Sequence, residues 1–164
     1  MYKNLLKYFI VIFIITFLFN SVSAQTIKKV SMKEVVQMID SSKTPIVINF
    51  WASWCKPCVQ EIPWFEKAIA TFKNKNIQLL LVSLDFKSDY PKTLTQFVKK
   101  KGFSSKVLWL NETNADYFCP LIDSSWSGNI PATLMVNNAK KYRQFFDQQI
   151  PEARLMLELN QLVQ

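Results

Sequence analysis

The 164-residue sequence has no histidine, two glycines and three cysteines. A four-ligand zinc site takes four Cys or His side chains, so this chain cannot build one of the usual kind. With glycine at positions 102 and 128 alone, the chain also lacks a glycine-rich loop for phosphate groups. It has no internal repeats and no nucleic-acid-binding motif, so we expect no nucleic acid partner.

The first 24 residues have the layout of a secretory signal peptide. Lys3 and Lys7 precede an apolar stretch over 8–19, and small residues follow at 22–24. The apolar stretch is shorter than the roughly 20 residues that span a bilayer. We therefore expect a signal peptide over 1–24 and one domain over 25–164; an uncleaved segment would instead anchor the protein to a membrane.

The predicted location is periplasmic or otherwise extracytoplasmic, where disulfides persist. The formal net charge of +8 includes basic clusters at 99–101 and at 140–143. A solvated face is the ordinary interpretation of such clusters, with contact to anionic lipid or an acidic protein as the alternative.

Hydrophobic periodicity predicts alternating helices and strands. Ser31 and Glu34 form a capping box, and Gly102 is a stop signal. We expect helices over 31–41, 57–75, 91–102 and from 151, strands over 45–52, 77–84 and 107–110, a helical turn within 112–122, and a hairpin of 133–136 with 141–146. This order predicts an α/β sheet with helices on both faces.

Cys55 and Cys58 stand where the first predicted strand meets the next helix. Pro57 suits the first helical turn, because the missing N–H would be unpaired there anyway. Cys55 then lies at the helix N-terminus, where the dipole and free N–H groups favour a thiolate. Cys58 lies on the same face, deeper in the helix, and can form a disulfide with it. The pattern predicts reversible thiol-disulfide exchange.

Other interpretations of a CxxC pair are a structural bridge, which would close too small a loop to constrain the unfolded chain much, and a soft metal clip. No His or Met stands beside the motif to favour the clip. We expect no metal and no cofactor.

The run from Asn49 to Cys58 (NFWASWCKPC), followed by Glu61 and Pro63 and later by Ile130-Pro131, resembles the thioredoxin superfamily. It is most similar to exported TlpA/ResA-like thiol-disulfide oxidoreductases, over residues 31–164. The resemblance implies a thioredoxin fold, a central mixed sheet flanked by helices, with an insertion within 85–125. It implies that Cys55 is the nucleophile and Cys58 the resolving thiol.

Thioredoxins place an Asp where this chain has Asn49, whereas the TlpA/ResA-like pattern has a glutamate that matches Glu61. A carboxylate one turn beyond Cys58 could take its proton during resolution if burial raises the pKa of the acid. We therefore count Glu61 as a candidate catalytic residue. The alternative is a solvated helix glutamate paired with Lys56 or Lys67.

Ile130-Pro131 resembles the family's cis-proline loop, which lies against the CxxC and leaves backbone free to pair with an extended substrate. The alternative is a trans proline at a strand start. The predicted substrate-binding residues are Trp54, Lys56, Pro57, Ile130 and Pro131.

The aromatic residues near the motif and the third cysteine complete the set of candidate residues. We expect Trp54 and Trp126 to flank the thiols as an apolar docking surface, whereas for Trp51 core packing is at least as good an interpretation. Cys119 is interpreted as a small buried hydrophobe, with a third redox thiol as the alternative.

The resemblance favours the reductant direction. Such a protein would receive electrons from a membrane thiol donor and reduce disulfides of exported proteins such as apocytochrome c. A disulfide-donating oxidase or isomerase would use the same residues, because direction depends on reduction potential. A different class is a CxxC metal-binding or chaperone module. A peroxidase lacks support, since the sequence does not show the usual threonine and arginine around a lone peroxidatic cysteine.

Overall fold

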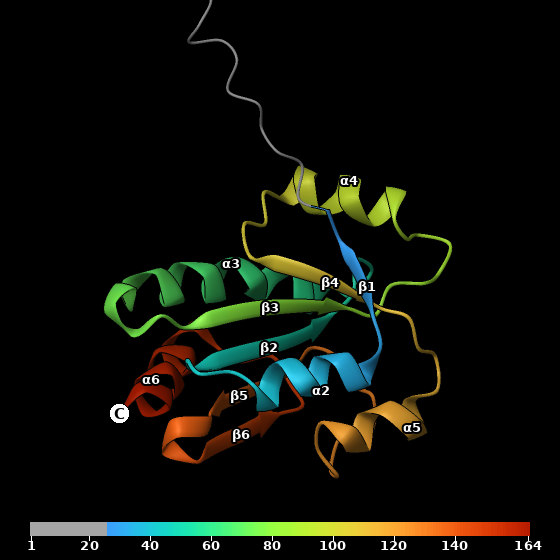
Figure 1. Ribbon diagram of the computed structural model, residues 1–164. Helices are drawn as coiled ribbons and strands as arrows, with labels where there is room; N and C mark the ends of the chain where they lie inside the picture. The colour runs from blue at the N-terminus through green and yellow to red at the C-terminus, as the bar shows by residue number, and fades with distance from the viewer. Residues whose placement is uncertain (1–25) are drawn as a thin grey trace, which may run out of the picture.

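The computed structural model describes residues 26–164, so the predicted signal peptide lies outside the described residues. Within these residues, six strands form one sheet in the order β1-β4-β3-β2-β5-β6 (Figure 1). β1 to β4 run parallel to one another, whereas β5 is antiparallel to β2 and β6 to β5, so the sheet is mixed as predicted. The strands are β1 (Lys28–Val30), β2 (Ile46–Trp51), β3 (Gln78–Ser83), β4 (Lys106–Leu110), β5 (Ala132–Asn137) and β6 (Tyr142–Phe146).

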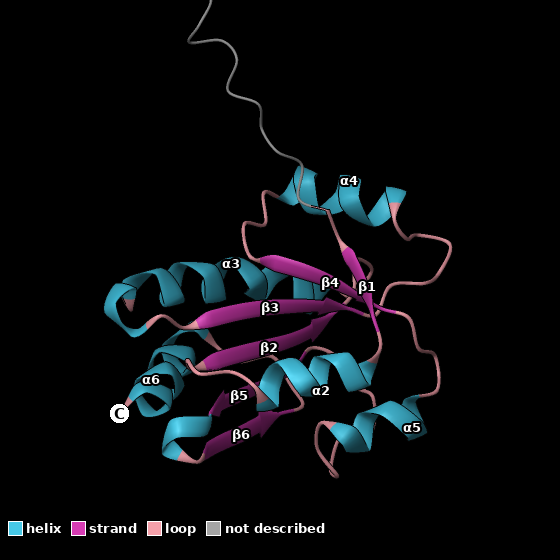
Figure 2. Ribbon diagram, viewed as in Figure 1, coloured by secondary structure: helices cyan, strands magenta, loops and turns pink. Residues whose placement is uncertain are grey.

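Helices cover both faces of this sheet (Figure 2). The helices are α2 (Met32–Asp40), α3 (Lys56–Thr71), α4 (Lys92–Lys101), α5 (Ala115–Phe118) and α6 (Glu152–Val163). One core packs α3, α4 and α6 against one face, and a second core packs α2 and the α5 region against the other. The predicted α/β class and the thioredoxin fold are confirmed by this arrangement.

Strand β2 contributes to both cores, because successive side chains of a strand point to opposite faces. Val47 and Trp51 belong to the α3 side, and Ile48 and Phe50 to the α2 side. Every residue of β2 is buried. A nearly continuous apolar run, interrupted in β2 by Asn49 alone, is typical of such a central strand, and it explains why the sequence predicted β2 well.

The predicted helix signals act as expected. Ser31 caps α2 and forms the full capping box with Glu34. Gly102 ends α4 with a φ of 69°, a left-handed conformation that glycine adopts without steric cost. The start of α2 and the end of α4 could be predicted because each depends on residues that are neighbours in the sequence.

The first strand and the connection from β5 to β6 differ from the sequence prediction. β1 was not predicted, since it has three residues, two of them exposed lysines, and only Val30 is buried. The β5–β6 hairpin does not turn at Asn137-Asn138; a 3-10 turn over Asn138–Lys140 follows, and Lys141 takes the left-handed conformation with φ 54°. The connection is therefore longer than the two-residue turn we expected.

The extra length predicted within 85–125 contains α4, β4 and α5, and β4 lies between β3 and β1. Within residues 26–164, no helix combines the length and apolar character needed to cross a bilayer.

Parallel pairing places the carboxyl ends of β2, β3 and β4 at one edge of the sheet. Trp51 is in register with Ser83, and Ser83 with Trp109. The CxxC segment follows β2 directly, so it lies at this edge, next to the loops that follow β3 and β4.

Candidate active site

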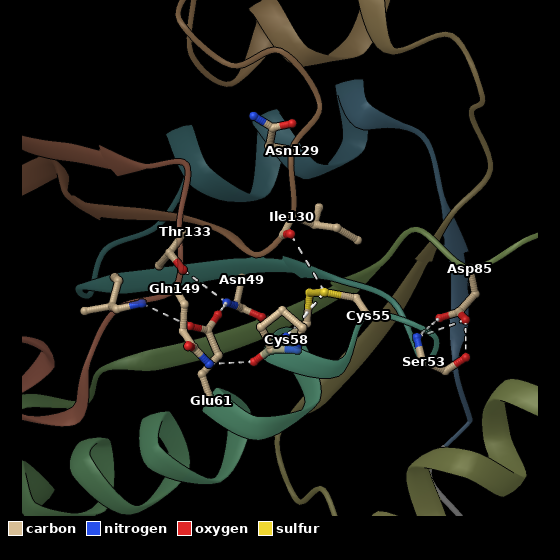
Figure 3. Close-up of a disulfide and its surroundings, with 12 residues drawn as sticks. Asn49, Ser53, Cys55, Cys58, Glu61, Asp85, Asn129, Ile130, Thr133 and Gln149 are labelled. Atoms are coloured by element: carbon tan, nitrogen blue, oxygen red, sulfur yellow. Dashed lines mark hydrogen bonds between the residues drawn. A yellow bond between two sulfur atoms is a disulfide. The ribbon is translucent and has the colours of Figure 1, made fainter.

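Cys55 and Cys58 form a disulfide at the start of α3 (Figure 3). Cys55 is the N-cap residue, and its sulfur accepts a hydrogen bond from the Cys58 N–H at 3.4 Å. Cys55 is 6% exposed and Cys58 is fully buried. Cys55 is thus the sulfur that a partner can reach. After reduction, the N–H and the helix dipole would stabilise its thiolate.

Glu61 lies one turn further along α3 and is fully buried. Its carboxylate accepts hydrogen bonds from Asn49 Nδ2 at 2.8 Å and from the Ile150 N–H at 3.1 Å. Burial raises the pKa of Glu61 to about 7, although both hydrogen bonds favour the charged form and so oppose the shift. The solvated alternative is therefore wrong for this residue; Lys67 pairs with Glu152 instead.

An acid with a pKa near 7 can both accept and donate a proton at neutral pH. Cys58 and Glu61 are three residues apart on one helix, a spacing that places side chains on the same face. A buried acid thus follows the buried sulfur by one turn of α3.

Asn49 connects Glu61 to β5. Besides its bond to Glu61, its Nδ2 donates to Thr133 Oγ1 at 3.0 Å, and all three side chains are buried (Figure 3). Sequence reasoning noted Asn49 as a missing acid, not as a partner of Glu61. Thr133 was missed, because its approach to Asn49 depends on the antiparallel register of β2 with β5.

The Ile130–Pro131 peptide bond is cis, as predicted. The Ile130 carbonyl oxygen lies 3.8 Å from Cys55 Sγ, so this loop contacts the reactive sulfur. The trans alternative is wrong. Trp126 also holds this loop, because its Nε1 donates a hydrogen bond to the Asn129 carbonyl at 2.8 Å.

A second polar contact, between Ser53 and Asp85, fixes the loop before Cys55 (Figure 3). The buried Asp85 carboxylate accepts from the Ser53 N–H at 3.0 Å, from the Ser53 hydroxyl and from the Ser83 hydroxyl at 2.7 Å. Sequence reasoning missed this acid, although its position directly after a buried strand was a usable signal. Gln149 adds a further contact, donating to the Pro57 carbonyl at 2.9 Å.

Two tryptophans named from the sequence have different places. Trp54 is 55% exposed beside Cys55 and stacks on Phe86, with ring centroids 5.9 Å apart. Trp126 is buried and packs against Phe50 at 4.6 Å, so its prediction as a docking residue is wrong. Trp51 is buried as predicted, and Lys56 and Pro57 are exposed at the start of α3.

Cys119 lies apart from the disulfide. It belongs to the core on the α2 side of the sheet, whereas Cys55 and Cys58 belong to the core on the α3 side. Burial, with the negative charge of Asp116, raises the pKa of the Cys119 thiol to about 11. Its environment is that of a small buried hydrophobe. Over residues 26–164, no group of three or more Cys, His, Asp or Glu side chains is arranged to hold a metal ion.

Comparison with known proteins gives one family and several relatives. The model of the AhpC/TSA family matches residues 19–144. The thiol-disulfide oxidoreductase ResA of Oceanobacillus iheyensis is 38% identical over 53 residues, 32% of this chain and 28% of ResA. ResA of Halalkalibacterium halodurans is 23% identical over 104 residues, 63% of this chain and 54% of ResA. The matches thus span about half or less of the length of these curated relatives.

Among solved structures, a thioredoxin-related protein from Neisseria meningitidis serogroup B is 23% identical, with a TM-score of 0.62 over 74% of this chain and 87% of that protein. A thioredoxin-family thiol:disulfide interchange protein from Chlorobium tepidum is 14% identical, with a TM-score of 0.60 over 86% of this chain and 95% of that protein. These similarities show that the fold is a thioredoxin fold.

Proposed function

This chain belongs to the AhpC/TSA family of thioredoxin-like proteins, and from that premise we propose that it is a thiol-disulfide oxidoreductase that uses Cys55 and Cys58. The observation that carries the proposal is the position of the disulfide. Its more accessible sulfur caps α3 and contacts the cis-proline loop, and its buried sulfur precedes a buried acid by one turn. The resemblance to TlpA/ResA-like proteins agrees with the names of the curated relatives.

In the reductant direction, the Cys55 thiolate attacks one sulfur of a substrate disulfide. A bond forms between Cys55 and that sulfur, and the other substrate sulfur leaves as a thiolate. Cys58 then loses its proton and attacks Cys55 Sγ, which restores the Cys55–Cys58 disulfide and releases the second substrate thiolate. Two electrons pass from the dithiol to the substrate.

Glu61 is the group proposed to take the Cys58 proton in the second step. A pKa of about 7 makes its carboxylate a base that is partly ionised at neutral pH. In Glu61→Gln, mixed-disulfide formation by Cys55 should persist, whereas its resolution should slow by about 10²-fold or more and lose its dependence on a group titrating near pH 7. If the variant keeps the pH profile of the wild type, Glu61 does not have this role.

The proposed substrates are disulfides of exported proteins such as apocytochrome c, with a membrane thiol donor as the source of electrons. The signal-like segment over 1–24 supports an extracytoplasmic location. A structural relative from Mycobacterium tuberculosis, 17% identical, is described as a secreted disulfide oxidoreductase. The Ile130 backbone beside Cys55 would pair with an extended substrate segment, while Trp54, Lys56, Pro57 and Pro131 would contact it.

The test of direction is the reduction potential of the Cys55–Cys58 pair, measured by equilibrating the purified protein with defined thiol buffers. We expect a value near or below about −270 mV, the value of thioredoxin, which makes the dithiol a reductant. A value near −120 mV, typical of strong oxidants, would identify a disulfide donor and contradict the proposed direction.

A further inference from the structure

A groove of about 510 Å³ opens beside the disulfide. Trp54 and Ile130, the neighbours of the Cys55 sulfur, form part of its lining. Asp85, which also lines it, lies on the other side of the disulfide from Glu61 (Figure 3). The volume of the groove falls within the range of ligand-binding sites in proteins. A segment lying in this groove would therefore end next to the reactive sulfur without covering the proton acceptor.

The topology of the sheet explains where the groove lies. The loops after β2, β3 and β4 contribute Trp54, Phe86 and Glu112, respectively. These strands are parallel, so the three loops meet at one edge, and ligands of such sheets bind outside the carboxyl ends of the strands.

An aromatic pair lies at the disulfide end of the groove. Trp54 and Phe86 stack at 5.9 Å and 21° between ring planes, yet they remain 55% and 64% exposed. Leu110, Ala115 and Phe118 add further apolar lining. Large aromatic rings left in solvent beside a reactive centre are typical of surfaces that bind a partner.

Glu112 provides a charge in this lining. Its Oε1 accepts a hydrogen bond from the Met32 N–H at 3.2 Å, whereas its Oε2 is buried and has no hydrogen-bond partner. A buried carboxylate oxygen without a partner is unfavourable, and a positive charge of a ligand in the groove would offset part of that cost through electrostatic attraction. The lining as a whole carries two carboxylates, Asp85 and Glu112, and one cation, Lys87, in a chain of formal net charge +8.

We propose that this groove binds an extended segment of the substrate protein in which an aromatic side chain and a Lys or Arg accompany the reactive cysteine. The aromatic side chain packs on Trp54 and Phe86, the cation is attracted to the Glu112 carboxylate, and the cysteine sulfur faces Cys55. This inference rests on the proposed oxidoreductase function and adds a substrate preference to it.

The test uses synthetic peptides that share one intramolecular disulfide loop, Cys-Ser-Gly-Cys. The loop is flanked on both sides by Phe and Arg, by Phe and Glu, or by Ser and Arg. The reduced full-length protein is mixed with each peptide, the reaction is quenched with acid, and the second-order rate constant of peptide reduction is determined by chromatography.

In the wild type, we expect the Phe/Arg peptide to react about tenfold faster than the Phe/Glu peptide, as for one partly desolvated charge pair. Glu112→Gln keeps the acceptor for Met32 but removes the charge, so this ratio should fall close to one. Asp40→Asn is the matched control. Glu112 contacts the first residue of α2, Met32, whereas Asp40 is the last residue of that helix, so removing its charge should keep the ratio. Phe86→Ala, at an exposed position, should reduce the preference for Phe/Arg over Ser/Arg.

Equal rates for all three wild-type peptides would overturn the proposed preference and leave the oxidoreductase function intact. A ratio that falls equally in Glu112→Gln and Asp40→Asn would also overturn it, because the effect would then come from net charge. If the protein reduces none of the peptides while thioredoxin reduces all of them, the proposed function itself fails. A dimer in sedimentation that Phe86→Ala dissociates would mean that a second copy fills the groove, which contradicts the proposal.

Discussion

Asn49 donates a hydrogen bond of 2.8 Å to Glu61, and both side chains are fully buried. The same Nδ2 donates to Thr133, so one amide connects the strand before the CxxC, the helix that contains it and the strand after the cis-proline. Asn49 Oδ1 is buried without a partner. Turning the amide over would present this oxygen to a protonated Glu61, so Asn49 has a suitable group for each state of the acid.

Asn49→Leu should raise the pKa of Glu61 above about 7, since it removes a hydrogen bond that favours the charged form and leaves the burial. The pKa is measured by carbon NMR of the labelled Glu61 carboxyl in the oxidised protein. Thr133→Val is the control, because Thr133 contacts Asn49 and its loss should move the pKa less. An unchanged pKa in Asn49→Leu would show that the hydrogen bond does not tune the acid.

Glu61 should also make folding stability depend on pH. Its pKa rises from an ordinary 4.5 to about 7 on folding, so between these values the folded protein holds a proton that the unfolded chain has released. The free energy of unfolding should therefore fall by about 3 kcal/mol, relative to Glu61→Gln, as the pH rises from 4 to 8. Urea unfolding of both oxidised proteins at several pH values measures the difference. Parallel stability curves would mean that the acid ionises normally.

The sequence predicted the parts of this site whose chemistry is local. Strand β2 and the cap at Cys55 follow from an apolar run and a proline at the first helical turn, whereas Glu61 was singled out from the family resemblance and its burial depends on tertiary packing. The cis-proline loop was predicted from family resemblance, since its contact with Cys55 joins residues 75 positions apart. The position of Asp85 directly after a buried strand was a signal in the sequence, but its contact with Ser53 and the place of Trp126 depend on strand register and loop paths, which the sequence does not encode locally.

Cys119 should react far more slowly than Cys55 with an alkylating reagent in the reduced, folded protein. Its pKa of about 11 leaves about one thiol in three thousand ionised at pH 7.5, and its side chain is buried. Mass spectrometry of iodoacetamide-treated protein should show Cys55 modified at least about 100-fold faster. Comparable rates would restore the third-thiol interpretation, and unfolding in urea should equalise the two cysteines as a control.

Substitutions of Trp126 and Trp54 should have different effects, the first on folding stability and the second on substrate binding. Trp126→Ala empties a buried position against Phe50 and should lower the free energy of unfolding by about 3–5 kcal/mol. Trp54→Ala removes an exposed ring and should cost less than about 1 kcal/mol, while it weakens reduction of peptide disulfides that carry an aromatic residue. Urea unfolding and peptide kinetics on both variants measure the two effects. A stable Trp126→Ala protein with impaired peptide reduction would instead return Trp126 to the docking surface, because the loss would then lie in substrate contact.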